Sequence, residues 1–288
     1  MATASNAPRL AGGILPSLAG LGPGALVRRL LRHRYLLRQL IRKNVSTVYQ
    51  GSMLGVSWIV VRPLMQLVIF GFCFGVVYQG RFFAQRHANP LEFALVLFVG
   101  LAIFSLVAEM LSIAPGLIAG NANFVKKVVF PLDLLVPAQL GSSVIQLAMS
   151  ATVFLLVRVF LDPPLGWAAL SVPILILPLM MLTLGVSWFL ASLGVFVRDL
   201  QQVVPLGITG LMFLSPLFYP VSAVPPLLRS TIYLNPLTFI VESARNALFL
   251  GTWPDPLGLA AYFAVAGLAM WCGWVWFEKT RKGFADVL

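Results

Sequence analysis

Charged residues are scarce in this chain of 288 residues: they make up only 10% of it, and the acidic ones are the rarer kind. Soluble domains carry about 25% charged residues, so this composition cannot provide a water-exposed surface of ordinary polarity. Only nine residues are acidic, and the first of them is Glu92. With 59% hydrophobic residues and a mean hydropathy of +0.93, the sequence predicts an all-α integral membrane protein.

Cysteine and histidine are nearly absent, which argues against several kinds of site. Cys73 and Cys272 both lie inside apolar runs, so we expect no disulfide framework. His33 and His87 flank apolar runs on opposite sides of the membrane, so we expect no metal site. No glycine is followed by lysine, so the phosphate-binding loop of an ATPase is missing and we expect no cofactor in this chain.

Acidic residues inside apolar runs are equally scarce, and Glu109 is the only one placed well within such a run. Ion-coupled transporters normally carry carboxylates or histidines at depth. A chain with neither that chemistry nor its own ATPase is most simply a membrane pathway subunit driven by a partner protein.

Six apolar runs are candidates to cross a hydrocarbon core about 30 Å thick. They predict membrane spans at about 56–78, 91–113, 134–160, 170–197, 203–220 and 257–277. Fourteen of the 20 lysines and arginines then fall on the side of the N-terminus and four on the other side. Because cations are enriched on the cytoplasmic side, we expect both termini in the cytoplasm. Residues 1–23 are expected to form a flexible tail and residues 50–288 the six-span domain.

Residues 24–49 carry seven cations and no acid. Leucines gather on one arc of the helical wheel, which predicts an amphipathic helix lying in the cytoplasmic interface among anionic lipids. The alternative is a solvated tail whose charges only enforce the topology. Because the cations cluster here and beside the spans, we expect no nucleic-acid partner.

Two further segments lie between the spans. The cytoplasmic segment 117–131 is either a short helix that offers Phe124 and two lysines to a partner protein or an ordinary loop. On the outer side, Asn235 followed by Pro236 is typical of a helix start, and Glu242 is spaced to pair with Arg245. We expect two short helices within 224–249, which either form a lid over a pathway or lie on the surface without a gating role.

Motifs spread over the chain carry a family resemblance. They are Tyr49-Gln50-Gly51-Ser52 with Leu54-Gly55, Trp58 and Pro63-Leu64; Asn121 to Lys127 through Phe130-Pro131; Val197-Arg198-Asp199-Leu200 with Pro205; Ser215 to Pro220; and Asn235-Pro236-Leu237 with Arg245. In their order and spacing the chain resembles the membrane subunits of ATP-binding-cassette polysaccharide exporters, which move O-antigen, capsular and teichoic-acid chains. The likeness covers roughly residues 25–285.

The resemblance implies a homodimer in the bacterial inner membrane with two ATPase subunits, which hold ATP and Mg, docked on the cytoplasmic face. It implies that the dimer passes a lipid-diphosphate-linked glycan through a channel. It also implies that the segment 117–131 is the coupling helix, with Asn121, Asn123, Phe124, Lys126 and Lys127 as its contact residues. The outer helices would then form a gate that includes Asn235, Pro236, Glu242 and Arg245.

Two further sets of residues follow from moving a phosphorylated glycan. Aromatic rings let a sugar chain slide without a deep trap, and the candidate channel residues are Phe70, Phe74, Tyr78, Phe213, Phe218 and Tyr219, although each, taken singly, fits a packing or lipid-facing role. Guanidinium groups bind phosphate oxygens in pairs, and the candidate attractors of the diphosphate are Arg28, Arg29, Arg32 and Arg62. Arg62 alternatively snorkels at the inner end of the first span.

Other readings of the whole chain stay open at this point. A drug or small-lipid exporter of the same architecture is one alternative, and a non-transport scaffold or lipid-modifying enzyme is another. The basic interfacial helix favours a phosphorylated lipid anchor, and the lack of clustered acids, His or Cys argues against catalysis.

Overall fold

The computed structural model describes residues 22–49, 51–73, 90–125, 130–160 and 165–288, and these residues are mostly helical. The chain divides into two compact units, residues 1–34 and 35–288. In the first unit, α1 (Pro23–Arg32) begins with a proline, whose fixed φ suits the first turn of a helix, and it ends at His33. The predicted helix over 24–49 is therefore two helices, α1 and α2 (Arg34–Tyr49).

Among the described residues of the second unit, four helices are long and apolar enough to cross a bilayer: α4 (Pro90–Leu117), α6 (Leu135–Arg158), α7 (Val172–Phe196) and α11 (Pro256–Thr280). They coincide with the second, third, fourth and sixth predicted spans. The helices at the first and fifth positions, α3 (Trp58–Phe70, apolar to Cys73) and α8 (Leu200–Leu214), are shorter. At 1.5 Å per residue they measure about 24 Å and 22 Å. Six complete crossings therefore stay a prediction.

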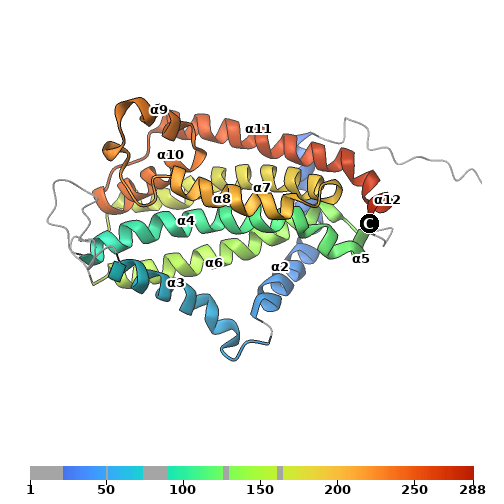
Figure 1. Cartoon of the computed structure of the whole chain (residues 1–288), viewed down its shortest axis with the longest axis horizontal. Helices are drawn as coiled ribbons and strands as arrows, with labels where there is room; N and C mark the ends of the chain where they lie inside the picture. The colour runs from blue at the N-terminus through green and yellow to red at the C-terminus, as the bar shows by residue number, and fades with distance from the viewer. Residues whose placement is uncertain (1–21, 50, 74–89, 126–129, 161–164) are drawn as a thin grey trace, which may run out of the picture. The chain divides into compact units, whose positions relative to one another are not determined.

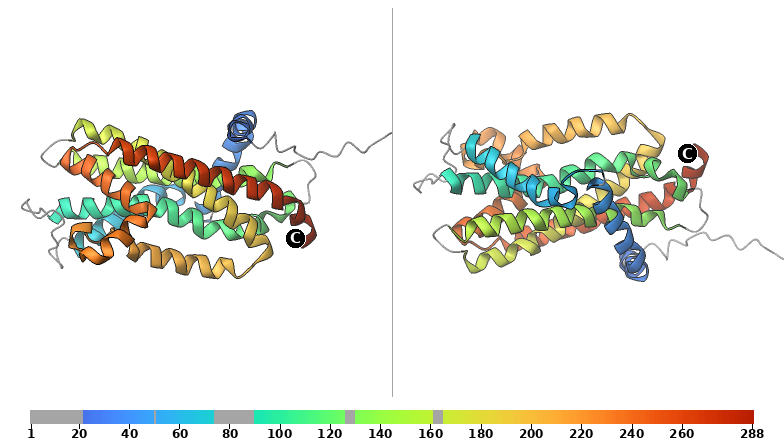
Figure 2. Two further views of the ribbon diagram at one scale, coloured as in Figure 1. Left: turned by 90° about the horizontal axis from the view of Figure 1, so that it is seen from above. Right: turned by 90° about the horizontal axis from the view of Figure 1, so that it is seen from below.

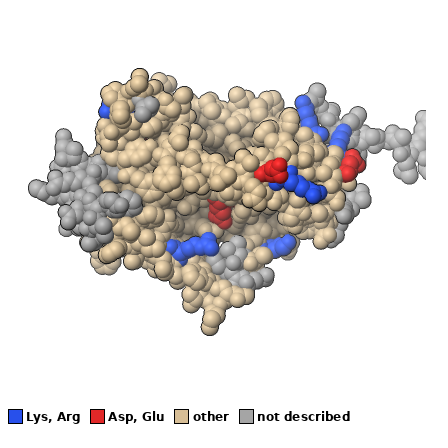
Figure 3. Space-filling view, in the orientation of Figure 1, with Lys and Arg blue, Asp and Glu red and all other residues tan. Residues whose placement is uncertain are grey.

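Helix α4 lies at the centre of the second unit, and most of its apolar stretch is buried. Helices α6, α7 and α8 pack against it, and α11 packs along α7 (Figure 1). Figure 2 shows α6 and α8 on opposite faces of this bundle. The outward surface is largely apolar: Leu156, Val265 and Leu268 are at least 60% exposed, and the face in Figure 3 is mostly uncharged. Such a surface is expected where lipid is the solvent.

The two ends of the bundle differ. Helices α9 (Pro226–Leu234) and α10 (Pro236–Arg245) lie at one end, and the short helices α5 (Ala122–Val125) and α12 (Phe284–Val287) lie at the other with the C-terminus (Figure 1). The segment 117–131, called the coupling segment after its predicted role, and the C-terminus are thus represented at one end by α5 and α12, and the two short helices lie at the other end. The side of the membrane that each end faces stays a prediction.

Glycines let the long helices cross at close range. A Cβ atom on Gly194 of α7 would meet the carbonyl of Pro115 on α4, and one on Gly273 of α11 would meet the carbonyl of Gly185 on α7. Ala269 and Gly273 form a small-xxx-small pair on α11, the pattern that lets membrane helices approach backbone to backbone. The crossings of α7 with α4 and α11 therefore depend on missing side chains.

We predict that Gly273→Ala destabilises the protein, because the added methyl group must push α11 away from α7. Overpacking of this kind typically costs about 1–3 kcal/mol. The matched control is Gly207→Ala on α8, where a Cβ meets nothing within 4 Å. Thermal unfolding in detergent should show a lower midpoint for Gly273→Ala alone, and equal midpoints for the two variants would contradict the packing argument.

Candidate functional site

Arg245, at the end of α10, lies at the centre of the end of the bundle that carries α9 and α10, which is called the outer end after its predicted side of the membrane. Its side chain is 1% exposed, and its guanidinium donates to three backbone carbonyls: Val96 of α4 at 2.9 Å, Pro216 at 2.5 Å and Leu217 at 2.7 Å. The approach to α4 requires Gly100, since a Cβ there would collide with the guanidinium. Burial lowers the pKa of Arg245 to about 9, so the side chain is still charged at neutral pH.

These bonds explain where α8 ends. The helix ends at Leu214 and Ser215 has an extended backbone, so the carbonyls of Pro216 and Leu217 lie beyond the helical hydrogen-bond ladder. In an apolar surrounding such carbonyls need another donor, and Arg245 supplies it. One side chain thus joins α4, α10 and the turn after α8.

The predicted start of the second outer helix is confirmed. Asn235 caps α10 by accepting a hydrogen bond from the Leu237 amide at 2.9 Å, and its own amide donates to the Ser215 hydroxyl at 2.8 Å. Pro236 occupies the first helical position. Burial raises the pKa of Glu242, while a backbone hydrogen bond with Val221 and the charge of Arg245 act in the opposite sense. The two short helices are present, and their gating role stays a prediction.

The structure brings four of the six candidate channel aromatics together. The Phe218 ring lies 6.4 Å from the Phe70 ring at the end of α3 and 6.2 Å from the Phe213 ring at the end of α8. The Tyr219 hydroxyl donates to the Phe213 carbonyl at 3.0 Å. These four residues form an aromatic cluster, in which Phe213 is 62% exposed. Phe74 and Tyr78 lie outside the described residues.

The coupling segment does not project its aromatic residue freely, as a helix that offers Phe124 to a partner would. Phe124 is half-buried: its ring stacks on Phe130 with 4.3 Å between centroids, and the Lys43 ammonium of α2 lies 5.3 Å from the ring centre. Asn121 turns back and donates to the Leu117 carbonyl at the end of α4 at 2.9 Å. Asn123 is exposed. Phe124 and Asn121 therefore position the segment, and Asn123 is on its outer surface. Lys126 and Lys127 lie outside the described residues.

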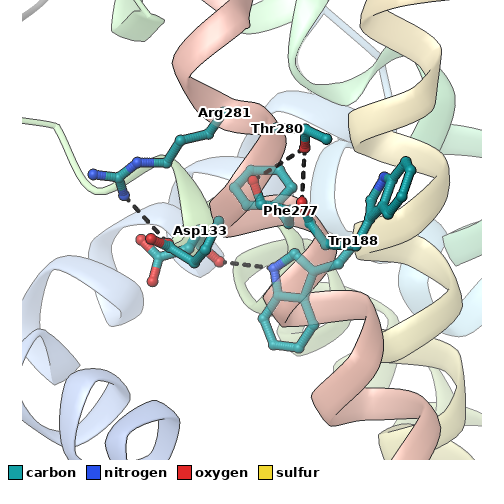
Figure 4. Close-up of polar contacts among 7 residues, drawn as sticks. Asp133, Trp188, Phe277, Thr280 and Arg281 are labelled. Atoms are coloured by element: carbon teal, nitrogen blue, oxygen red, sulfur yellow. Dashed lines mark hydrogen bonds and ion pairs between the residues drawn. The ribbon is translucent and has the colours of Figure 1, made fainter. Parts of the chain in front are cut away.

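The chain beyond the coupling segment is bonded to α7, and α7 in turn is bonded to α11 (Figure 4). The buried Trp188 indole of α7 donates to the Asp133 carbonyl at 3.1 Å, just before α6 begins. The Ser192 and Thr280 hydroxyls are 2.6 Å apart and join α7 to the end of α11. A displacement of the coupling segment would therefore reach both long helices.

The candidate arginines divide into two groups. Arg28 and Arg32 of α1 are exposed and Arg29 is half-buried. Arg62, on α3, lines a cavity of about 220 Å³ between α3, α4 and α6 and interacts electrostatically with Glu109. That carboxylate offsets the charge of Arg62, so a diphosphate gains less attraction there than at α1.

Sequence reasoning missed most of the side chains in this cavity, although a signal was present. Ser143, Gln146 and Ser150 recur at helical spacing along one face of α6, opposite the acidic residue Glu109. Within the described parts of the chain, no group of His, Cys, Asp and Glu could hold a metal ion.

We predict that Arg245→Met destabilises the outer end, because it removes a charged donor from three buried carbonyls. Those of Pro216 and Leu217, which lie beyond the end of α8, are then left unsatisfied. An unsatisfied buried group typically costs about 1–3 kcal/mol. Arg229→Met is the matched control: Arg229 is only half-buried and binds two carbonyls of its own turn, Val224 and Ser222, both at 2.8 Å. Purified Arg245→Met should unfold at a clearly lower temperature than Arg229→Met. Equal midpoints would show that the three bonds are dispensable.

Comparison with known proteins places this architecture in a family. The chain is 26% identical over 263 residues to the O-antigen export system permease protein RfbA of Myxococcus xanthus, covering 91% of this chain and 98% of that protein. A protein of the same name from Klebsiella pneumoniae is 28% identical, covering 88% and 95%. The polysialic acid transport protein KpsM of Escherichia coli is 24% identical, covering 74% and 80%. The profile of the ABC-2 type transporter family matches residues 35–249, and the chain belongs to that family.

Proposed function

We propose that the chain is the membrane subunit of an exporter that carries a lipid-diphosphate-linked polysaccharide across the bacterial inner membrane. Two copies form the channel, and two separate ATPase subunits drive it from the cytoplasm, where both termini lie. The observation that carries this proposal is that the similarity to O-antigen export permeases runs through almost the entire chain. The scarcity of intramembrane acids supports an engine outside this chain.

The aromatic cluster supports a polysaccharide as the cargo. Phe70, Phe213, Phe218 and Tyr219 stand where the two short helices α3 and α8 end, close to the outer turn that Arg245 holds. Helix α8 has no buried residue, so it offers a long uncovered face to a partner or a substrate. Aromatic faces stack on the apolar faces of sugar rings, and such contacts are weak enough to be made and released repeatedly.

The basic helix α1 supports a phosphorylated lipid anchor. Arg28, Arg29 and Arg32 lie within about one turn of each other, and Val27 and Leu31 are exposed apolar residues of the same helix. An amphipathic helix of this kind lies in the interface with its cations among headgroups. Guanidinium groups there would gather the diphosphate, which carries negative charge at neutral pH.

Reconstitution with the ATPase partner tests the function and the role of α1 together. Lipid-diphosphate-linked glycan should stimulate ATP hydrolysis in proteoliposomes. A triple variant in which glutamine replaces Arg28, Arg29 and Arg32 should show at least fivefold less stimulation. The control triple changes Arg34, Arg38 and Arg42, three exposed arginines of α2, and should retain most of it. Stimulation by small apolar drugs instead of the glycan would contradict the proposed cargo. Equal losses in both triples would show only a general charge effect.

Docking of the ATPase is tested at the exposed surface of the coupling segment. Asn123→Trp adds a large ring to this surface and should reduce co-purification with the ATPase at least tenfold. Ser222→Trp is the matched control, since Ser222 is also exposed but belongs to the short helix Val221–Ala223 just before α9, and α9 is at the opposite end of the bundle from α5. Undiminished co-purification of Asn123→Trp would place the docking surface elsewhere.

A further inference from the structure

The cavity between α3, α4 and α6 has an unusual place and an unusual lining. On α4 it is lined by residues 102–109 and on α6 by residues 143–150, which are the middles of two apolar helices. Polar and ionisable groups at such depth are costly, and they normally mark a functional site. The volume of about 220 Å³ exceeds that of a single water, whose share of the liquid is about 30 Å³.

The acidic residue of the cavity is held in place by its neighbours. The Gln146 amide donates to the Glu109 carboxylate at 2.9 Å, and Ser143 forms a second hydrogen bond to it. A carboxylate has about four acceptor positions, so these two bonds leave Glu109 able to accept from a ligand. Its orientation is therefore set before a ligand arrives, which lowers the entropy cost of binding.

The remaining polar groups offer both donors and acceptors. Arg62 and Gln66 present N–H groups from α3. The Ser105 and Ser150 hydroxyls donate to carbonyls of their own helices and so present lone pairs to the cavity. One cation and one anion line the cavity, so it favours neither a free anion nor a free cation. Apolar residues complete the wall: Ile59, Pro63, Ala102, Leu106 and Leu147.

We propose that this cavity binds a single neutral sugar ring of the exported glycan. Each hydroxyl of a pyranose both donates and accepts, which matches the mixed lining, and its C–H faces match the apolar wall. Arg62 and Ser105 are exposed while Ser143 is buried, so the cavity opens to the outside of the subunit and closes inward. The inference rests on the proposed function, because a sugar is at hand only if the chain exports a glycan.

The test measures binding of defined probes to the purified, full-length chain. Methyl glycosides of several neutral hexoses and N-acetylhexosamines are titrated against thermal unfolding, with inorganic phosphate as the charged probe. At least one glycoside should raise the midpoint, and Gln146→Leu and Ser143→Ala should each weaken its apparent affinity at least fivefold. Thr152→Val is the control, because Thr152 is an exposed residue of α6 outside the cavity lining, and its hydroxyl donates to the Ala148 carbonyl of its own helix.

Three outcomes would overturn the assignment: no glycoside acts, phosphate acts more strongly, or both variants bind as well as the control. Ser143→Ala removes a single atom, and the midpoint without ligand shows whether each variant is folded. A cavity that fails this test while lipid-linked glycan still stimulates ATP hydrolysis leaves the proposed function intact. Absence of that stimulation in the wild type would instead refute the function itself.

Discussion

A buried guanidinium holds the outer half of this protein together. Arg245 reaches backbone carbonyls of α4 and of the turn after α8, two segments more than 100 residues apart in the chain. In a bilayer every backbone group must find a partner within the protein, and a helix that stops early creates a deficit there. Arg245 supplies the missing hydrogen-bond donors, and its buried charge is tolerated because the guanidinium donates to carbonyls of the protein. The early end of α8, the turn after it and the position of α10 therefore depend on one another.

The opposite end is built on a different principle. There Phe124 stacks on Phe130 beside Lys43, and Trp188 fixes the start of α6 through the Asp133 carbonyl. Close glycine crossings then join α7 to α4 and to α11. Close-packed protein interiors have low compressibility and transmit strain. A push on the coupling segment is therefore expected to travel along the long helices toward the outer turn.

Away from the coupling segment, two groups of side chains bear on the proposed function. Glu109 is oriented by Gln146 and balanced by Arg62, while aromatic rings gather where α3 and α8 end. Under the proposed function these two features act differently on a glycan. Rings provide weak stacking along its path, whereas the cavity recognises one sugar by its hydroxyls. A conductor needs both low affinity along the way and a means of choosing its cargo.

Much of this architecture follows from local features of the sequence. Composition determined a multi-span membrane protein, because long apolar runs act segment by segment, and the placement of the cations beside these runs predicts its orientation. The start of α10 at Asn235 and Pro236 was also predictable, since a cap depends only on its immediate neighbours.

Contacts between distant segments were decided only by the tertiary structure. The sequence around Arg245 suggests a pair with Glu242, but it does not indicate the hydrogen bonds to the Val96 and Pro216 carbonyls. Likewise, the sequence around Phe124 does not indicate that its ring contacts Phe130 and Lys43. The polar face of α6 was visible as a period in the sequence, but its meeting with Glu109 depended on how α6 crosses α4. Hydropathy indicates which residues are buried away from water. The residues that contact each other across the fold are determined by how the helices pack, and the sequence of a single segment does not specify that packing.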